Sequence, residues 1–434
     1  MRRDIQISRE STNAVRSRSG NGVARDLETL LNFLRIRGAS TRPLVARETG
    51  FSRAVVAQRL GDLQSTGLVV DSGRDASSGG RPPQKIQFNA DRGHVLVADL
   101  GATSIDVAVA DLDGRIVAHV SEDADISAGP EIILSHVEQL FDNVRAVSGQ
   151  AGGVPWGIGV GLPGPVEFNT GRPVAPPIMP GWDAYPVRER LTNRLCVPVW
   201  VDNDVNVMAL GERAEGSARG VDDFIFVKIG TGIGAGIVSH GTIQRGVQGS
   251  AGDVGHIQVV SDPDIICRCG NVGCLEAVAG GAALGRSALR AAEQRASVTL
   301  AEMRAQRGTL SARDVAEAAR HGDPVSVQLL QQAGRHIGQM LATAVNLMNP
   351  SLIVIGGGVA GAGDVLMASI REVVYGRSLP LATRHLQIRH STIGDRAGIA
   401  GVAAMVIDEL FAPERVSSWI ENGSPVGRPE PAFY

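Results

Sequence analysis

Residues 94–120 read HVLVADLGATSIDVAVADLDGRIVAHV, three short apolar runs separated by tight turns. Runs of this length, rich in valine and isoleucine and bounded by glycine and aspartate, are typical of strands. We therefore expect strands over 94–100, 104–111 and 115–120. This pattern differs from that of the preceding ninety residues and marks the start of an α/β body.

The turn after the first of these strands has the composition of a phosphate-binding loop. Asp99 ends the strand, and Gly101 and Thr103 form the turn. Such a loop presents backbone N–H groups and a hydroxyl to phosphate oxygens, while the aspartate can hold a metal ion or its water. The pattern D-x-G-x-T alone is weak evidence, because Asp-Gly turns are common.

Two further glycine-rich turns follow apolar strands, in FIFVKIGTGIGAGIV (224–238) and in NPSLIVIGGGVAGAG (349–363). Two separated phosphate-type turns that face one cleft are stronger evidence for a phosphate-binding site than either turn alone. The glycines of 349–363 can let a nucleotide base lie close to the backbone. The residues concerned are Gly230, Thr231, Gly232, Gly356 and Gly357. Lys228 stands in the strand before the first of these turns. It is consistent with an altered nucleotide site, and equally with a side chain that extends to solvent.

Three polar residues follow a short apolar strand in VWVDNDVNVMALGE, residues 199–212. Asp202, Asn203 and Asp204 end that strand, and a helix beginning near Val205 can follow. Either aspartate can cap this helix. Asp204 is well placed to accept a proton from a substrate hydroxyl.

A histidine and three of the chain's four cysteines lie within GHIQVVSDPDIICRCGNVGCLEAV, residues 255–278. Three thiolates and one imidazole complete a tetrahedral zinc site with no open position, which is structural rather than catalytic. The alternative is a set of buried free thiols. The proposed ligands are His256, Cys267, Cys269 and Cys274. We interpret the remaining cysteine, Cys196, as part of the core.

The first ninety residues predict a winged helix-turn-helix. Leucines at helical spacing indicate a helix over 24–36, a second helix follows over 43–49, and Ser52 caps a third over 53–65. Ala46, the turn glycine Gly50 and apolar Val56 stand at helix-turn-helix offsets.

Two strands, around 68–71 and 85–89, bracket a wing with the tip GRDASSGGRPP. The side chains placed to reach bases or phosphates are Ser52, Arg53, Gln58, Arg59 and, on the wing, Arg81. A three-helix packing module that does not bind DNA is the alternative.

Charge and composition fit a DNA-binding module on a larger body. The 434 residues suffice for two or three domains and carry a net charge of −3. Lys and Arg outnumber Asp and Glu within residues 1–90, and the reverse holds for the rest. No run is long enough for a membrane helix, and the N-terminus lacks the apolar core of a signal peptide. We expect a cytoplasmic protein, associated with the nucleoid when bound to DNA.

Residues 92–412 resemble the ROK family, named for its repressors, open reading frames and kinases. DLGAT is similar to its first phosphate motif and GTGIGAG to its second, while GVQGSAGDVGHIQV with CRCGNVGCLE is similar to its sugar and zinc signature. The resemblance implies an actin-like, ribonuclease-H-like ATPase fold of two α/β lobes around a cleft. The winged helix is similar to that of the family's sugar-responsive regulators.

The resemblance also implies roles for individual residues. The positions matching sugar-binding residues of the family's kinases are Asn203, Asp204, His256 and Glu276, with Asp253 where the family has glutamate. Asp204 matches the general base. Zinc would fix the loop that carries His256. Ile178 replaces an asparagine of the family pattern, so the sequence does not name the sugar.

The domain expectations follow directly. Residues 1–20 are expected to be disordered, 21–90 to form the winged helix, 91–202 lobe 1 (completed by a helix over 396–412), 203–395 lobe 2 with the zinc site, and 413–434 a flexible tail.

The sequence is compatible with two functions. The first is a DNA-binding regulator, homodimeric or homotetrameric, that reads an inverted repeat and senses a sugar or sugar phosphate. The second is a sugar kinase that uses ATP and magnesium and has an accessory DNA module. A purely structural partner protein has no residue in its favour.

Overall fold

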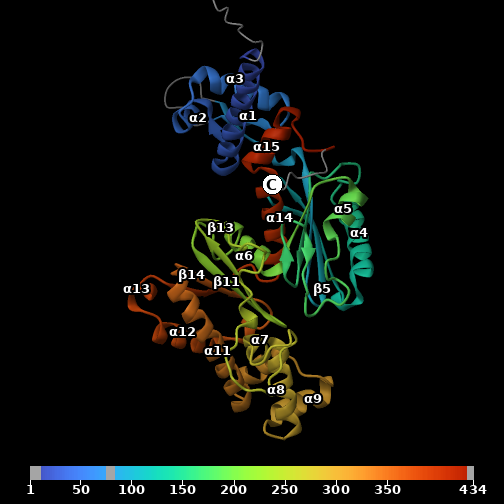
Figure 1. Cartoon of the computed structure of the whole chain (residues 1–434), viewed down its shortest axis with the longest axis vertical. Helices are drawn as coiled ribbons and strands as arrows, with labels where there is room; N and C mark the ends of the chain where they lie inside the picture. The colour runs from blue at the N-terminus through green and yellow to red at the C-terminus, as the bar shows by residue number, and fades with distance from the viewer. Residues whose placement is uncertain (1–10, 75–83, 428–434) are drawn as a thin grey trace, which may run out of the picture.

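The computed structural model describes residues 11–74 and 84–427, arranged as three parts along the long axis of the molecule (Figure 1). The winged helix lies at one end, lobe 1 in the middle and lobe 2 at the other end. Within the described residues no helix is long and apolar enough to cross a membrane.

The N-terminal part is the winged helix that the sequence predicts. Its helices are α1 (Ser11–Arg37), α2 (Arg42–Thr49) and α3 (Arg53–Ser65), and its strands are β1 (Ser40–Thr41), β2 (Val69–Arg74) and β3 (Gln84–Phe88). The strands pair in the order β1-β3-β2. Gly50 ends α2 at φ 75°, with its N–H donating to Ala46, and Val56 is buried on α3. The predicted turn offsets therefore describe the observed turn.

The first helix is longer than predicted. It begins at Ser11, whereas the sequence predicted a helix from Ala24 after a disordered segment up to residue 20. Residues 11–20 read STNAVRSRSG and lack the apolar period on which the prediction relied, so the extra turns gave no signal. Residues 1–10 and the wing tip 75–83, which includes Arg81, lie outside the described residues.

Lobe 1 is a five-stranded sheet in the order β10-β7-β4-β5-β6. Its strands are β4 (His94–Leu100), β5 (Ser104–Asp111), β6 (Ile116–Asp123), β7 (Ile158–Leu162) and β10 (Val199–Asn203). The first three confirm the predicted strands and pair antiparallel, while β7 and β10 run parallel to β4. The lobe is completed by three helices, α4 (Pro130–Val147), α5 (Val187–Leu195) and α14 (Arg396–Leu410). It also contains a small hairpin of β8 (Val166–Glu167) and β9 (Arg172–Pro173).

Lobe 2 has a second five-stranded sheet in the order β13-β12-β11-β14-β15. Its strands are β11 (Phe224–Ile229), β12 (Ile233–Ser239), β13 (Thr242–Ile243), β14 (Leu352–Gly356) and β15 (Gln387–His390). Its helices are α6 (Asp204–Ala214), α7 (Leu275–Ala279), α8 (Gly281–Glu293), α9 (Val298–Arg307), α10 (Ala312–Arg320), α11 (Pro324–Met348), α12 (Asp364–Arg377) and α13 (Pro380–Thr383).

The two lobes meet where α6 packs against α14. A Cβ on Gly401 would lie 1.6 Å from the Val207 carbonyl oxygen, and one on Gly211 would lie 2.1 Å from that of Ala397. Only glycine permits this approach of the two helix backbones. The helix predicted over 396–412 is thus present, and it joins lobe 1 to lobe 2.

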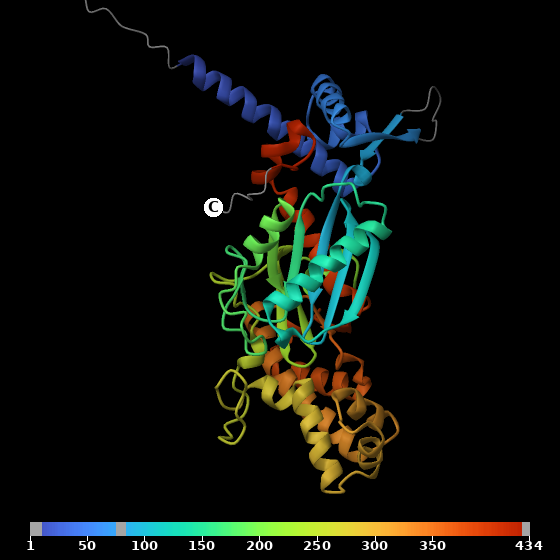
Figure 2. The same cartoon turned by 90° about the vertical axis from the view of Figure 1, so that its right-hand side faces the viewer.

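The C-terminal segment differs from the flexible tail that the sequence suggested. Residues Pro413–Trp419 form α15 and Ile420–Asn422 form a 3₁₀ turn, and both contact α1 (Figure 2). Trp419 is 3% exposed, and its ring lies 5.3 Å from that of Phe411. Apolar side chains at helical spacing are buried between the winged helix and lobe 1. The free energy gained by this burial outweighs the flexibility that the Ser, Gly and Pro content of the segment favours.

Candidate functional site

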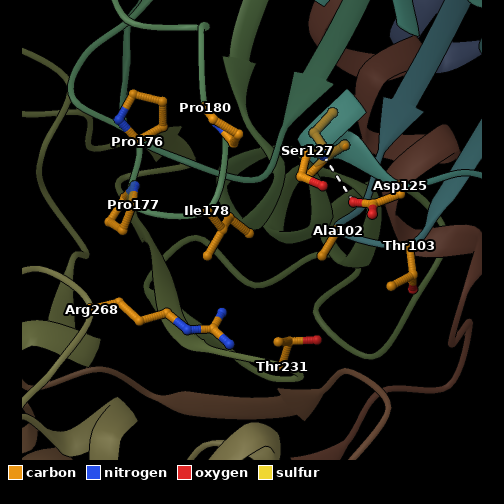
Figure 3. A pocket seen from close by; sticks show the side chains of 11 residues that line it. Ala102, Thr103, Asp125, Ser127, Pro176, Pro177, Ile178, Pro180, Thr231 and Arg268 are labelled. Carbon is orange, nitrogen blue, oxygen red and sulfur yellow. Dashed lines mark hydrogen bonds between the residues drawn. The ribbon is translucent and has the colours of Figure 1, made fainter. Parts of the chain in front are cut away.

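The two phosphate-type turns face one cavity between the lobes, as the sequence predicted. Thr103, after β4, and Thr231, after β11, both line a cavity of about 550 Å³ (Figure 3). The Gly101 N–H donates to the Ser104 carbonyl at 2.9 Å and closes the first turn.

The second turn is fixed by the start of a helix. The Gly281 N–H at the beginning of α8 donates to the Gly230 carbonyl at 2.8 Å, and the next N–H, of Ala282, donates to Thr231. These N–H groups would otherwise be free to bind an anion.

Packing explains the glycines after β14. A Cβ on Gly356 would lie 2.6 Å from the Phe226 ring, and Gly357 has φ 88° and lies against the Ile229 carbonyl. Their role near a nucleotide base stays a prediction.

One wall of the cavity is a lobe 1 loop that carries Ile178. Trp182, buried just beyond, donates from its ring N–H to the Ile126 carbonyl at 3.2 Å.

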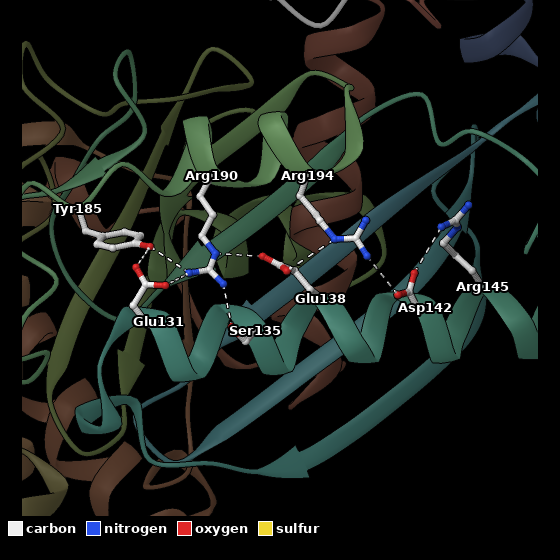
Figure 4. A network of polar contacts seen from close by, with 8 residues as sticks. All are labelled: Glu131, Ser135, Glu138, Asp142, Arg145, Tyr185, Arg190 and Arg194. Carbon is white, nitrogen blue, oxygen red and sulfur yellow. Dashed lines mark hydrogen bonds and ion pairs between the residues drawn. The ribbon is translucent and has the colours of Figure 1, made fainter.

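A polar network joins α5 to α4 behind this loop (Figure 4). Arg190 on α5 contacts Glu131, Ser135 and Glu138 on α4. The Tyr185 hydroxyl also donates to Glu131, at 2.6 Å. This network holds α5 and the end of the loop onto α4.

Asp202, Asn203 and Asp204 have three different environments. Asn203, and neither aspartate, caps α6, because its Oδ1 accepts from the N–H groups of Val205 and Asn206. Its amide donates to Gly164 at 2.9 Å. Asp202 is 1% exposed and forms an ion pair with Arg245 at 2.7 Å. Asn203 was predicted to bind sugar, but most of its hydrogen-bonding capacity is used by the protein.

The predicted base, Asp204, is paired with a lysine. Its Oδ2 lies 2.5 Å from Nζ of Lys228, and the residue is 4% exposed. Burial disfavours the ammonium, but the carboxylates of Asp204 and Asp99 outweigh this effect and raise the pKa of Lys228. The lysine in β11 therefore extends to a carboxylate and not to free solvent.

Asp99 completes this cluster at the end of β4. Burial raises the pKa of Asp99 to about 7; Lys228 acts in the opposite direction, and Asp204 adds to the rise. One carboxylate oxygen, Oδ1, has no hydrogen-bond partner among the described residues. A Cβ on Gly398 of α14 would lie 1.7 Å from the other oxygen, so the carboxylate lies directly against that helix.

The Cys₃His cluster has the geometry of a tetrahedral metal site. The ligand atoms of His256, Cys267, Cys269 and Cys274 all lie within 4.8 Å of one another. Sγ of Cys269 and Sγ of Cys274 are 3.8 Å apart. Zn–S bonds of about 2.3 Å in a tetrahedron place two sulfurs about 3.8 Å apart, so the residues fit zinc.

Without a shared cation the crowded thiols of this cluster favour the protonated form. Burial and the neighbouring Cys269 and Cys267 thiols raise the pKa of the Cys274 thiol to about 12. Clustered thiolates need a shared cation, and a metal ion supplies it. Gly270 (φ 89°) and Gly273 (φ 69°) let the chain turn between ligands, as predicted.

The cluster is joined to the second turn through α7. Cys274 precedes Leu275, the first residue of α7, and Glu276 follows. Oε2 of Glu276 accepts from the Ile233 N–H at 3.2 Å and lies against Gly232. A metal bound at the cysteines would therefore order the helix that holds the glycine turn.

The other predicted sugar residues lie near α7 and the cysteine cluster. Nε2 of His256 is 4.0 Å from a carboxylate oxygen of Asp253. Glu276 lines a second cavity of about 410 Å³, which shares Thr231 and Arg268 with the first cavity. Of the predicted sugar set, only Glu276 lines a cavity, and Asn203, Asp204, Asp253 and His256 line neither.

The proposed DNA-reading residues divide into two groups. Arg53 and Gln58 are exposed on α3, as is Ser52 just before it, whose hydroxyl caps the helix by accepting from the Val55 N–H at 3.3 Å. Arg59 is only 16% exposed and lies between Asp26 and Asp62. Its guanidinium is turned toward α1, so Arg59 is not on the exposed face where the sequence placed it.

Arg268 and Cys196 lie where the sequence did not predict them. Arg268 is exposed and lines both cavities; its position between two ligand cysteines was the available signal. Cys196 is exposed and not in the core, because it caps the C-terminus of α5 in the left-handed region at φ 54°.

Fold and site together define a class of protein: a winged helix-turn-helix module on a two-lobed α/β body of the sugar kinase type. The ROK family model matches residues 95–409, more than half of the chain, and the chain therefore belongs to the ROK family.

Both branches of the family contain similar proteins. A glucokinase of Halalkalibacterium halodurans is 34% identical over 326 residues, which is 75% of this chain and 98% of the glucokinase. A putative xylose repressor of Caldicellulosiruptor sp. is 30% identical over 390 residues, 89% of this chain and 95% of the repressor. The repressor match is too long to fit between residue 95 and the C-terminus, so it includes part of the winged helix.

A solved structure agrees over the whole architecture. The crystal structure of a ROK family transcriptional regulator, described as a homolog of the E. coli MLC protein, superposes with a TM-score of 0.76 at 26% identity. It covers 93% of this chain and 100% of its own.

Proposed function

We propose that this protein is a DNA-binding transcriptional regulator, a repressor of carbohydrate genes, whose ROK body senses a sugar or sugar phosphate. The observation that carries this proposal is the winged helix, with Arg53 and Gln58 exposed on α3, packed onto a two-lobed body with an inter-lobe cavity. The likeness to regulators over most of the chain supports it.

The effector binds between the lobes in this proposal. The cavity is lined by residues of both lobes, such as Thr103 and Thr231, so a ligand there contacts both and can favour one degree of closure. Arg268 supplies a cation that suits a phosphorylated sugar. Zinc in the Cys₃His cluster is structural.

DNA recognition requires a second copy of the chain. One winged helix makes few base contacts, so the protein acts as a homodimer or homotetramer on an inverted repeat, with half-sites about one helical turn apart or a multiple of that. Partners are then DNA, the effector and the chain itself. The protein works in the cytoplasm and joins the nucleoid when bound to DNA.

Linkage gives the test. An inverted repeat is first selected by the protein from random DNA and is then titrated with the protein to measure DNA affinity. The titration is done with and without glucose, xylose or N-acetylglucosamine, and with and without a phosphate ester of each sugar. An effector that changes DNA affinity must have its own affinity changed by the same factor when DNA is bound. Binding of a sugar at saturation with unchanged DNA affinity contradicts the sensor function for that sugar.

A sugar kinase, using ATP and magnesium, is the second candidate because glucokinases are similar to the body and Asp204 is present. If the protein phosphorylates a sugar, Asp204→Asn should abolish turnover, since the side chain keeps its shape but loses its basicity. Sugar binding should persist in a calorimetric titration. Turnover near that of the unmodified protein in Asp204→Asn would exclude Asp204 as the base.

A further inference from the structure

The carboxylates of Asp99 and Asp204 already have a cation of the protein's own between the two lobes, the ammonium of Lys228. Lys228 is the one partly exposed residue of β11; the other five are buried. Its Nζ lies 2.5 Å from Oδ2 of Asp204. Its Cε lies 3.5 Å from the place where a Cβ on Gly230 would be. The side chain therefore runs beneath the second glycine turn and ends at the predicted base.

The ammonium acts on both carboxylates of the cluster. Asp204 is hydrogen-bonded to it, and its charge also stabilises the ionised form of Asp99. Asp99 lies near the end of β4 in lobe 1, whereas Asp204 begins α6 and Lys228 lies in β11, both of lobe 2. One lysine thus neutralises charge at the point where the lobes meet.

Phosphoryl transfer to a sugar needs two things at such a place. A carboxylate oxygen takes the hydroxyl proton while the sugar oxygen bonds to the γ-phosphorus and the bond to ADP breaks. A divalent cation neutralises the phosphate charge during this step. Here Oδ2 of Asp204 already accepts a hydrogen bond from an ammonium, and a divalent cation placed at these carboxylates would be repelled by it. The residues present do not fit a magnesium ion.

We propose that the Lys228 ammonium takes the place of the divalent cation at Asp99 and Asp204, so that the cleft binds a sugar without phosphorylating it. The inference rests on the proposed function, because it explains how a kinase-type body serves as a sensor. Lys228 acts as a positioning residue: it holds Asp204 oriented as a hydrogen-bond acceptor and excludes the metal.

Manganese binding tests this directly, because free Mn²⁺ is quantified by its electron paramagnetic resonance. The full-length zinc-loaded protein is compared with Lys228→Met and with Lys228→Gln, which removes the charge but keeps a hydrogen-bond donor for Asp204. Both variants should bind one Mn²⁺ at least tenfold more tightly than the unmodified protein. If Lys228→Met does not fold, Lys228→Gln decides.

Two controls locate the effect. Lys228→Arg keeps the positive charge and should bind Mn²⁺ as weakly as the unmodified protein. Adding Asp204→Asn to Lys228→Met should remove the gained binding, because one of the two carboxylates is lost. Equal Mn²⁺ affinity in the unmodified protein and both neutral variants overturns the proposal.

Turnover supplies the second readout. ADP release is measured with MgATP and glucose, xylose or N-acetylglucosamine. The inference is supported if the turnover of Lys228→Met exceeds that of the unmodified protein at least tenfold. It is overturned if the unmodified protein has measurable turnover that Lys228→Met does not raise. A tenfold difference in Mn²⁺ affinity in a protein whose DNA binding ignores all sugars would support the role of Lys228 and contradict the proposed sensing function.

Discussion

At the scale of single residues, the four proposed zinc ligands are the most sharply defined feature of the molecule. Their spacing in sequence predicted a closed tetrahedral site, and their side-chain atoms lie within one coordination sphere of each other. The structure adds what a bound metal would hold in place. It would fix α7, whose Glu276 accepts a hydrogen bond from the Ile233 N–H just after the second glycine turn.

Replacing Cys269 by Ser should remove the metal. The purified protein should contain about one zinc per chain by atomic emission, and Cys269→Ser should contain little. Because a metal that binds only the folded state stabilises it by mass action, the loss should be at least about 2 kcal/mol, on the order of 4–8 °C in melting temperature.

The exposed Cys196 provides the matched control, since Cys196→Ser changes the same atoms outside the cluster. It should keep both zinc and melting temperature. A stable, metal-free parent protein with reactive thiols at all three cluster cysteines would contradict the zinc assignment.

Asp99 should make the protein less stable as pH rises. Burial raises its pKa to about 7, whereas an unfolded aspartate titrates near 3.9. Between these values the native state holds a proton that the unfolded state has lost, so stability falls with rising pH across this window. Asp99→Asn removes the ionisable group and should be more stable than the parent above pH 7, by about 1–2 kcal/mol after solvent screening.

Urea unfolding at pH 5 and pH 8, followed by tryptophan fluorescence, measures this effect. Asp123→Asn on β6 makes the same chemical change at an exposed position and should leave the pH dependence unaltered. Parallel pH profiles for Asp99→Asn and the parent would show that Asp99 does not titrate in this window.

At the scale of secondary-structure elements, α3 separates residues that face solvent from residues that hold the module together. The sequence placed Arg53 and Arg59 on one polar face. The helix does present Arg53 to solvent, but Arg59 turns back to Asp26 of α1 at 3.5 Å. Helical period fixes the direction of a Cβ, while a long side chain still selects its partner from neighbouring elements.

The two arginines should therefore behave differently when replaced by alanine. Arg53→Ala should weaken binding to the selected inverted repeat about 10- to 100-fold, the range for a base contact, with unchanged melting temperature. Arg59→Ala should lower the melting temperature of the winged helix, because it removes the ion pairs to Asp26 and Asp62. Fluorescence anisotropy and thermal denaturation measure the two effects. The assignment is wrong if Arg59→Ala weakens DNA binding as much as Arg53→Ala at full stability.

At the scale of the whole molecule, α14 joins the carboxylate cluster of Asp99, Asp204 and Lys228 to the winged helix. Near its start, Gly398 lies against the Asp99 carboxylate. Just after its end, the Phe411 ring lies 3.9 Å from the Arg35 guanidinium of α1. One helix thus contacts the inter-lobe cluster and the DNA-binding module, and α15 covers this junction.

Arg35 should carry part of the coupling between effector and DNA. Burial lowers the pKa of its guanidinium, and the charges of Asp408 and Asp113 act against that shift. A buried cation–π contact contributes about 1–2 kcal/mol, so Arg35→Ala should reduce the effector-induced change in DNA affinity about fivefold or more. Effector affinity without DNA should stay within twofold.

Arg37 is the control, because it lies two residues further along α1 with an exposed side chain. Arg37→Ala should leave the coupling unchanged. Coupling is measured as the ratio of DNA affinities with and without effector. An equal ratio in Arg35→Ala and in the parent would exclude this contact from the transmission of the signal.

The sequence by itself determined the local features of this protein. Strand and helix periods, the turn at Gly50, the spacing of the cysteines and the glycine turns each depend on interactions within a few residues. Such patterns were sufficient for the winged helix and for the candidate metal ligands, whereas the two-lobed fold class came from the resemblance to the ROK family. They gave no signal for the first turns of α1, whose residues lack apolar period.

Only the tertiary structure decided which distant side chains meet. Lys228 reaches Asp204 because β11 of one sheet ends beside the first residue of α6. The C-terminal Trp419 is buried because α1 and lobe 1 leave an apolar surface between them. These pairings depend on sheet register and on the close approach of α6 and α14, and residues far apart in the chain carry no local pattern that encodes them.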